Sequence, residues 1–216
     1  MLVNNGSAFE PFTVVSLATL NSATRILRNG GIIAFPTDTI YGIGSDIYDK
    51  AAVSRIFSIK SRPSGLPLPV LISNPAQVES LTDQISPLAL SLMQRFWPGG
   101  LTIIFNKSPY FDSPLLAGQK KIGIRMPAHP VPLWLINELG SPIVGTSANL
   151  HNLEATLTAE EVRQQLGSKL DFIIDGGKCQ GGIESTILDI TCNPPRISRP
   201  GIISGEAIEE AIMDLL

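Results

Sequence analysis

Between Asn29 and Gly44 the chain reads NGGIIAFPTDTIYGIG. Apolar residues at helical spacing precede this stretch, and the two glycines near its start are a typical helix stop. The run Ile32–Phe35 then has the composition of a short buried strand. The loop that follows, Pro36–Gly42, carries two threonine hydroxyls and the carboxylate of Asp38. A helix, a buried strand and a polar loop in this order indicate an α/β fold.

The same pattern continues along the chain on both sides of the loop. Helical spacing and capping residues predict helices over residues 17–27, 49–59, 86–97, 130–139, 158–166 and 204–216. Short apolar runs predict strands over residues 32–35, 69–72, 101–105, 122–126, 143–144, 172–174, 187–190 and 196–198. We therefore expect a single α/β domain with a twisted mixed sheet over residues 13–216, preceded by an irregular lead-in over residues 1–12.

The composition excludes several classes of protein. Hydrophobic residues make up 44% of the 216 residues and charged residues only 16%, so the chain is not globally disordered. A net charge of −3 argues against a general nucleic-acid coat or a membrane-surface binder, and no apolar run approaches the length of a membrane span. The start of the chain resembles no export signal, and Cys179 and Cys192 form no disulfide framework. The expectation is a cytoplasmic protein with reduced thiols and no membrane contact.

Several common catalytic motifs are missing from the sequence. It contains no GxxxxGK[ST] phosphate loop, no complete dinucleotide fingerprint and no GxSxG nucleophile elbow. Its only histidines, His129 and His151, have no cysteine or histidine partners at zinc spacing, and we expect both in loops or on the surface. Catalysis is therefore expected to depend on positioning and electrostatics, with no metal bound by protein side chains alone.

Four polar loops remain as candidates for a binding site. They span residues 36–42, 60–63, 145–149 and 184–186, and the strand after the last one leads to Arg199. Lysine and arginine neutralise phosphate or carboxylate oxygens, and small hydroxyl side chains supply short hydrogen bonds. Each loop taken alone also fits an ordinary helix end or turn. Together they favour a ligand that carries phosphate or carboxylate groups, although they name no reaction.

The order of these segments resembles the threonylcarbamoyl-AMP synthase family, the YrdC/TsaC-like proteins. The matching segments are NGGIIAFPTDTIYGIG (29–44), KSRP with PLPVLI (60–72), FWPGGLTIIF (96–105), IGIRMPAHP (122–130), GTSAN (145–149), DFIIDGG (171–177) and ESTILDI with ISRPGIIS (184–204). The functional signature of that family joins a Lys-x-Arg pair to a Ser-x-Asn pair. Here those residues are Lys60, Arg62, Ser147 and Asn149.

The resemblance implies a mixed α/β sheet curved around a large electropositive cavity. It also implies the reaction of L-threonine, bicarbonate and ATP to threonylcarbamoyl-adenylate and pyrophosphate, with Mg2+ accompanying ATP. The product would serve tRNA threonylcarbamoyl-adenosine modification through downstream transfer proteins, with a local tRNA contact possible. The chain resembles the short, single-domain form of the family.

The resemblance also assigns roles to individual residues. Lys60 and Arg62 are the expected catalytic residues. ATP is expected to bind to Lys60, Arg62, Ser147, Asn149 and Arg199. L-Threonine is expected to bind to Thr37, Arg125, Ser147 and Ser185, with Arg125 on its carboxylate.

Two segments depart from the usual family pattern, Leu66 and the LHNLEATLT run at residues 150–158. These departures keep a second interpretation open, a non-catalytic RNA- or nucleotide-binding module on the same fold. The acidic balance of the chain weighs against that module. A carbamoyl-transfer domain of the hydrogenase-maturation type would share the fold but is normally part of a longer protein.

Overall fold

The computed structural model describes residues 15–61, 65–150 and 153–214. Its helices are α1 (Leu17–Arg28), α2 (Lys50–Lys60), α3 (Val78–Leu81), α4 (Pro87–Phe96), α5 (Pro130–Leu139), α6 (Ala159–Leu166) and α7 (Gly205–Met213). Its strands are β1 (Ile33–Phe35), β2 (Gly42–Gly44), β3 (Val70–Leu71), β4 (Leu101–Asn106), β5 (Lys121–Arg125), β6 (Ile143–Val144), β7 (Thr146–Ser147), β8 (Phe172–Ile173), β9 (Thr186–Asp189) and β10 (Arg196–Arg199). The α/β class is confirmed, whereas the expected lead-in over residues 1–12 lies outside the described residues.

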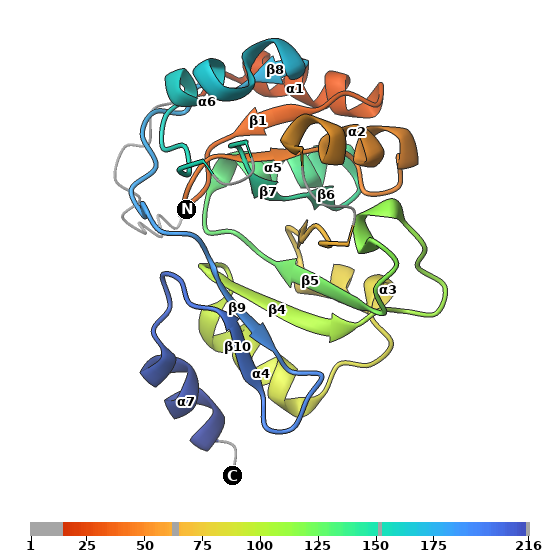
Figure 1. Ribbon diagram of the computed structural model, residues 1–216, viewed down its shortest axis with the longest axis vertical. Coiled ribbons are helices and arrows are strands. Elements are labelled where there is room, and N and C mark those ends of the chain that lie inside the picture. The colour runs from red at the N-terminus through yellow and green to blue at the C-terminus, as the bar shows by residue number, and fades with distance from the viewer. Residues whose placement is uncertain (1–14, 62–64, 151–152, 215–216) are drawn as a thin grey trace, which may run out of the picture.

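The strands divide into two mixed sheets, where the sequence had predicted one. The smaller sheet has the order β7-β2-β1-β8, and the larger has the order β10-β9-β4-β5-β3-β6. Each sheet contains parallel and antiparallel pairs: β1 runs parallel to β8 and antiparallel to β2, and β4 runs parallel to β9 and antiparallel to β5. Figure 1 shows the smaller sheet and its helices above the larger sheet.

The chain passes from the larger sheet to the smaller one at Gly145. Strand β6 pairs with β3. Only Gly145 separates β6 from β7, and β7 pairs with β2. A Cβ atom at Gly145 would collide with the side chain of Leu71, so only glycine fits this close approach. The two sheets are therefore separate ladders that meet at Gly145 and at an isolated bridge between Asp46 and Ile143. Apolar patterning does not reveal this arrangement.

Two apolar clusters hold the helices against the sheets. The larger cluster includes Ile56 of α2, Leu92 of α4 and Ile208 of α7. The smaller cluster lies between the paired helices α1 and α5 and strand β1, and it contains Leu27, Leu135 and fully buried Phe35. Within the described residues no helix is long and apolar enough to cross a membrane.

Local side-chain caps explain where several helices begin. The Asp49 carboxylate accepts hydrogen bonds from two backbone amides at the start of α2, and Ser86 does so once at the start of α4. Thr158 and Glu161 form the predicted capping box of α6. The sequence analysis missed α3 and the 3-10 turn before it, although the capping box of Asn74 and Gln77 is a signal for that turn.

Candidate active site

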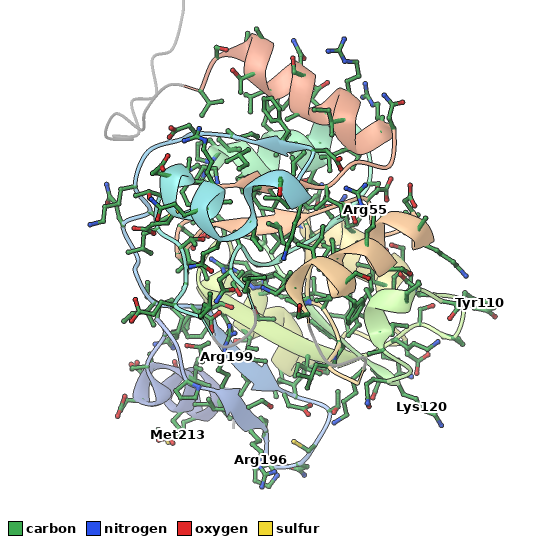
Figure 2. The ribbon with its side chains drawn as sticks, turned by 45° about the horizontal axis from the view of Figure 1, so that its top comes forward. Arg55, Tyr110, Lys120, Arg196, Arg199 and Met213 are labelled. Atoms are coloured by element: carbon green, nitrogen blue, oxygen red, sulfur yellow. The ribbon has the colours of Figure 1, made fainter. Side chains whose placement is uncertain are left out.

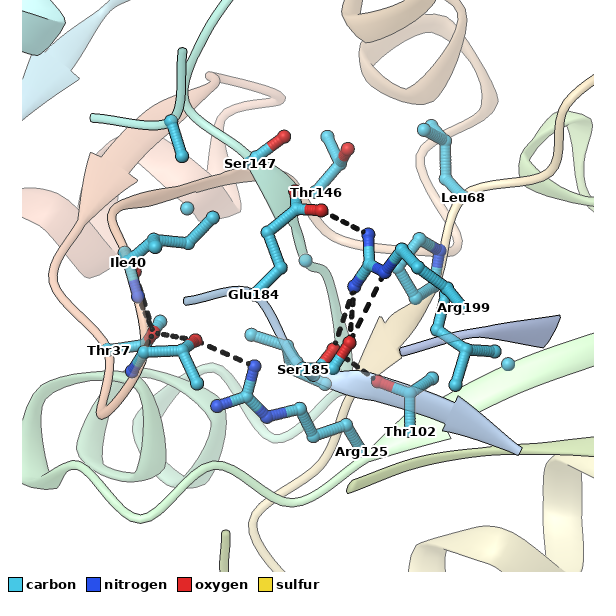
Figure 3. Close-up of a pocket in the computed structure, with 18 of the residues that line it drawn as sticks. Thr37, Ile40, Leu68, Thr102, Arg125, Thr146, Ser147, Glu184, Ser185 and Arg199 are labelled. Carbon is cyan, nitrogen blue, oxygen red and sulfur yellow. Dashed lines mark hydrogen bonds and ion pairs between the residues drawn. The ribbon is translucent and has the colours of Figure 1, made fainter. Parts of the chain in front are cut away.

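A cavity of about 770 Å3 opens between the two sheets. All four polar loops predicted from the sequence contribute to its wall or adjoin it. Its charged lining residues are Lys60, Lys121, Arg125, Arg199 and Glu184, so cations outnumber carboxylates four to one among the described residues. Figure 3 shows the arginines pointing into this space from the strands of the larger sheet, opposite the turn that carries Thr37.

Arg125 at the end of β5 is buried and held at all three nitrogens of its guanidinium group. Its Nε donates to the carbonyl of Gly99 at 2.9 Å, and Nη1 donates to Oγ1 of Thr39 at 3.0 Å. Its Nη2 lies 2.7 Å from Oδ1 of Asp38. Burial lowers the pKa of Arg125, while the neighbouring Asp38 opposes that shift. One hydrogen on each terminal nitrogen remains for a ligand in the cavity.

Thr37 lies in the same turn as Asp38, but its hydroxyl is committed to the turn itself. The Thr37 hydroxyl donates to the carbonyl of Ile40 at 2.6 Å. It also accepts hydrogen bonds from the backbone amides of Thr39 and Ile40. Thr37 therefore shapes the cavity wall, and its hydroxyl has little capacity left for a ligand.

Lys60, the last residue of α2, is 2% exposed although it carries a charge. Its ammonium group donates to the backbone carbonyl of Ser147 and to that of Asn149, the latter at 2.8 Å. The side-chain oxygens of the same two residues lie 3.4 and 3.2 Å away. Lys60 thus holds the Ser147–Asn149 segment in place. The side-chain amide of Asn149 also donates a hydrogen bond to the carbonyl of Leu153.

Arg199 at the end of β10 forms the second arginine–carboxylate pair of the cavity. Its Nε and Nη2 both donate to the backbone carbonyl of Ser185, at 3.2 and 2.7 Å. Its Nη1 lies 2.7 Å from Oε2 of Glu184. The Ser185 hydroxyl contacts Nη2 of Arg199 and lies 2.9 Å from the Thr102 hydroxyl. Figure 2 shows Arg199 toward the middle of the molecule, with Arg196 of the same strand at its outer end.

His129 lies in the loop before α5, as the sequence analysis expected, but it is buried beside this site. Its Nδ1 accepts a hydrogen bond from the amide of Val131 at the start of α5, so the ring caps that helix. Burial lowers the pKa of His129 from 6.5 to about 4, although the charge of Asp38 acts in the opposite direction. The ring is therefore neutral near pH 7.

The other candidates for metal or thiol chemistry lie apart from one another. Among the described residues no group of three or more histidine, cysteine, aspartate and glutamate side chains is placed to hold a metal ion. Cys179 is buried and Cys192 exposed, and neither forms a disulfide. Burial raises the pKa of Cys179 to about 11, so this thiol is protonated at neutral pH. His151 lies outside the described residues.

The structure brings most of the predicted site residues together. The cavity is lined by Thr37, Lys60, Arg125, Ser147, Asn149, Ser185 and Arg199. Arg62 lies outside the described residues, so its place in the site stays a prediction. The segment that departs from the family pattern also reaches the cavity, through Leu153 and Ala155.

Among the polar residues of the site that sequence reasoning missed are two carboxylates and two residues within strands. Asp38 and Glu184 stood inside the quoted polar loops, but nothing in the sequence paired them with Arg125 and Arg199. Thr102 and Lys121 lie within strands and line the cavity because their side chains fall on the inner face of the sheet. Lys121 could have been found, because it lies four positions before Arg125 and alternate residues of a strand share a face. Thr102 had no such neighbour among the predicted site residues.

Comparisons with known proteins agree with this geometry. The profile of the Sua5/YciO/YrdC family, described as "Telomere recombination", matches residues 25–201. The threonylcarbamoyl-AMP synthase of Bacillus subtilis is 42% identical over 191 residues, which is 88% of this chain and 55% of the relative. That of Pyrococcus abyssi is 39% identical over 193 residues, or 89% of this chain and 57% of the relative. The chain spans little more than half the length of these two relatives.

A solved structure shows the same fold with an amino acid bound. The crystal structure of Pyrococcus abyssi Sua5 complexed with L-threonine superimposes with a TM-score of 0.87 at 39% sequence identity. The match covers 89% of this chain and 57% of the Pyrococcus chain.

Proposed function

The chain belongs to the Sua5/YciO/YrdC family, and from that premise we propose that it makes threonylcarbamoyl-adenylate and pyrophosphate from L-threonine, bicarbonate and ATP. The observation that carries the proposal is the composition of the cavity between the two sheets. This cavity gathers residues of the Lys-x-Arg, Ser-x-Asn and ESTILDI segments around four cationic side chains. A reaction among anionic substrates needs such a concentration of positive charge.

L-Threonine takes the part of the cavity around Arg125. The two hydrogens that remain on the terminal nitrogens of Arg125 face a carboxylate, and the fixed guanidinium sets the orientation of the amino acid. The hydroxyls of Ser147 and Ser185 supply the polar contacts to the rest of the molecule. Thr37 contributes through the shape of its turn.

ATP takes the part of the cavity near Arg199 and the Ser147–Asn149 segment. In the reaction, bicarbonate takes up a proton and loses water to give CO2, the neutral amine of threonine attacks that CO2, and the proton released from the nitrogen goes to solvent. A carbamate oxygen then attacks the α-phosphorus. The P–O bond to pyrophosphate breaks and its electron pair leaves with pyrophosphate. Arg199 and Arg62 stabilise that charge, whereas Lys60 acts by holding the Ser147–Asn149 segment in place.

Mg2+ enters with ATP in this proposal. The cavity lining includes one carboxylate, Glu184, and that carboxylate already pairs with Arg199. The residues present therefore fit an ion held mainly by phosphate oxygens and water, which is how Mg2+ commonly binds nucleotides. The ion would supply charge neutralisation on the phosphates.

The direct test is product formation by the purified protein. It is incubated with ATP, Mg2+, bicarbonate and L-threonine, and the adenylate is sought by rapid mass spectrometry. Threonine-dependent adenylate and pyrophosphate are expected, and a reaction without threonine gives the background. Arg125→Ala is expected to raise the threonine requirement more than the ATP requirement. The reverse order would show that the amino acid binds elsewhere.

The competing function is a nucleotide- or RNA-binding module without turnover. The observation that favours it is the presence of the apolar Leu153 and Ala155 in the cavity wall, because they belong to the segment that departs from the family pattern. ATP or RNA binding without threonine-dependent product would support this module. As a synthase, the protein would act in the cytoplasm and pass its product to proteins that transfer the threonylcarbamoyl group to tRNA.

A further inference from the structure

We propose that Glu184 binds the α-ammonium group of the amino-acid substrate and makes the cavity selective for amino acids over 2-hydroxy acids. This inference rests on the proposed function, because it assigns a further residue to the same cavity. Its starting point is the charge of the wall, in which Glu184 is the only carboxylate among the described lining residues. A zwitterionic substrate needs one anionic contact as well as its cationic ones.

Only one carboxylate oxygen of Glu184 takes part in the ion pair with Arg199. Its Oε2 lies 2.7 Å from Nη1 of Arg199, whereas its Oε1 receives no hydrogen bond from any described residue. The side chain is 35% exposed, and Figure 3 shows it extended between Arg199 and the turn of Thr37. An ammonium group can therefore approach Oε1 while the ion pair with Arg199 persists.

Several other oxygen acceptors that line the cavity are already engaged. The Thr37 hydroxyl is used by its own turn, and Oγ1 of Thr39 accepts from Arg125. The carbonyls of Ser147 and Asn149 accept from Lys60. An ammonium group that loses its water in the cavity needs hydrogen-bond acceptors from the protein. Oε1 of Glu184 is such an acceptor, and because it is charged it forms a stronger hydrogen bond than a neutral oxygen.

The backbone around Glu184 holds its side chain over the cavity. The Glu184 carbonyl accepts a hydrogen bond from the amide of Ile202 at 3.0 Å, and the next carbonyl, that of Ser185, accepts twice from Arg199. A Cβ atom at Gly201 would collide with the Glu184 carbonyl, so the two segments approach as closely as glycine allows. The carboxylate is thus placed before a substrate arrives.

The placement also accounts for selectivity. Ser185, which the proposed function assigns to threonine, directly follows Glu184, and its hydroxyl lies in the same hydrogen-bonded group as Arg199 and Thr102. Arg125 recognises the carboxylate that amino acids and 2-hydroxy acids share. Glu184 contacts the α-substituent, which is an ammonium group in an amino acid and a hydroxyl in a 2-hydroxy acid.

The test compares the binding of two ligands to the full chain by calorimetry. The first ligand is L-threonine, and the second is the 2,3-dihydroxybutanoate in which a hydroxyl replaces the ammonium with the same configuration. In Glu184→Gln we expect the affinity for L-threonine to fall about 10- to 100-fold, the range for loss of a charged hydrogen bond. The affinity for the hydroxy analogue is expected to change by less than about threefold, because a hydroxyl can also bond to an amide.

The matched control is Glu210→Gln. Glu210 pairs with Arg95 at the same 2.7 Å distance but on the surface between α7 and α4, so its removal should leave both affinities unchanged. Glu184→Asp, which keeps the charge on a shorter side chain, should bind L-threonine with intermediate affinity. Circular dichroism of the variants reports whether the protein remains folded, and their ATP affinity reports whether Arg199 keeps its position.

Each outcome has a distinct meaning. Equal losses for both ligands, or a loss for ATP alone, would show that Glu184 acts only by orienting Arg199 and would overturn the inference. Unchanged threonine affinity in Glu184→Gln would also overturn it. Absence of threonine binding to the wild-type chain would instead contradict the proposed function itself.

Discussion

Two arginine–carboxylate pairs face the same cavity with the same 2.7 Å separation, yet they differ in their surroundings. In the pair of Arg125 and Asp38 the side chains are 8% and 17% exposed, and the guanidinium is held by three groups. In the pair of Arg199 and Glu184 they are 38% and 35% exposed. Distance alone therefore says little about what each pair contributes.

The two pairs differ in the cost of removing the carboxylate partner. A buried guanidinium without its carboxylate keeps an uncompensated charge away from water, which is costly. A half-exposed guanidinium is hydrated instead, so the loss is small. We infer that the Arg125 pair is a rigid part of the fold that also orients a ligand. The Arg199 pair is free to serve binding at little cost to stability.

The largest expected effect is that of Asp38→Ala on stability. Removal of this carboxylate should lower the free energy of unfolding by about 3–5 kcal/mol, as is typical when one member of a buried ion pair is removed. Urea-induced unfolding followed by circular dichroism measures the change. A loss below about 1 kcal/mol would mean that the two pairs are energetically alike.

A second effect of burial should appear on acidification. His129 titrates near 6.5 in the unfolded chain and at about 4 in the folded protein, because burial disfavours its charged form. The unfolded chain therefore binds more protons between these values, and stability falls as the pH decreases from 6.5 to 4. A full shift of this size corresponds to about 3 kcal/mol.

His129→Asn separates this effect from other acid-sensitive groups. Asparagine can still accept a hydrogen bond from the amide of Val131, so the cap of α5 is retained, but it does not titrate. The variant should lose less stability than the wild type over the same pH range. Parallel losses in the two proteins would contradict the buried, neutral state of His129.

Lys60→Met extends the comparison to a buried cation that donates to backbone carbonyl oxygens. Methionine has a similar shape but leaves the carbonyls of Ser147 and Asn149 without the ammonium donor. We expect a loss of about 2 kcal/mol in unfolding free energy and a fall in adenylate formation of about 100-fold or more. Full activity in a stable Lys60→Met protein would refute the positioning role.

The smallest effect is expected for Glu184→Ala, the counterpart of Asp38→Ala. Because both members of this pair are half-exposed, the free energy of unfolding should fall by less than about 1 kcal/mol. The same urea titration as for Asp38→Ala provides the measurement. A loss of several kcal/mol would place Glu184 among the residues that hold the fold together.

The sequence predicted those parts of the fold that depend on local chemistry. The cap at Asp49, the Ser86-Pro87 start of α4 and the capping box at Thr158 use residues within a few positions of one another. The division into two sheets depends on where the chain crosses between them, as at Gly145, and on the pairing of two-residue strands. Such short strands carry too little apolar pattern to be recognised or paired from sequence.

The site was predictable to a similar degree. Motif order identified seven described residues that line the cavity, because the resemblance names them one by one. Their partners could not be found in this way. Asp38 and Arg125 are 87 positions apart, and which arginine pairs with which carboxylate depends on how β5 and β10 end at the cavity. The sequence analysis expected Lys60 to contact ATP. In the structure its ammonium group is buried and donates to protein carbonyls, which the sequence does not reveal.

A crystal structure with L-threonine and a non-hydrolysable ATP analogue tests the central claim most directly. We predict that both ligands occupy the cavity together, with the threonine carboxylate on Arg125 and the contact between Arg125 and Asp38 retained. A threonine carboxylate bound away from Arg125, or an Arg125 that leaves Asp38 when the ligands bind, would contradict the account.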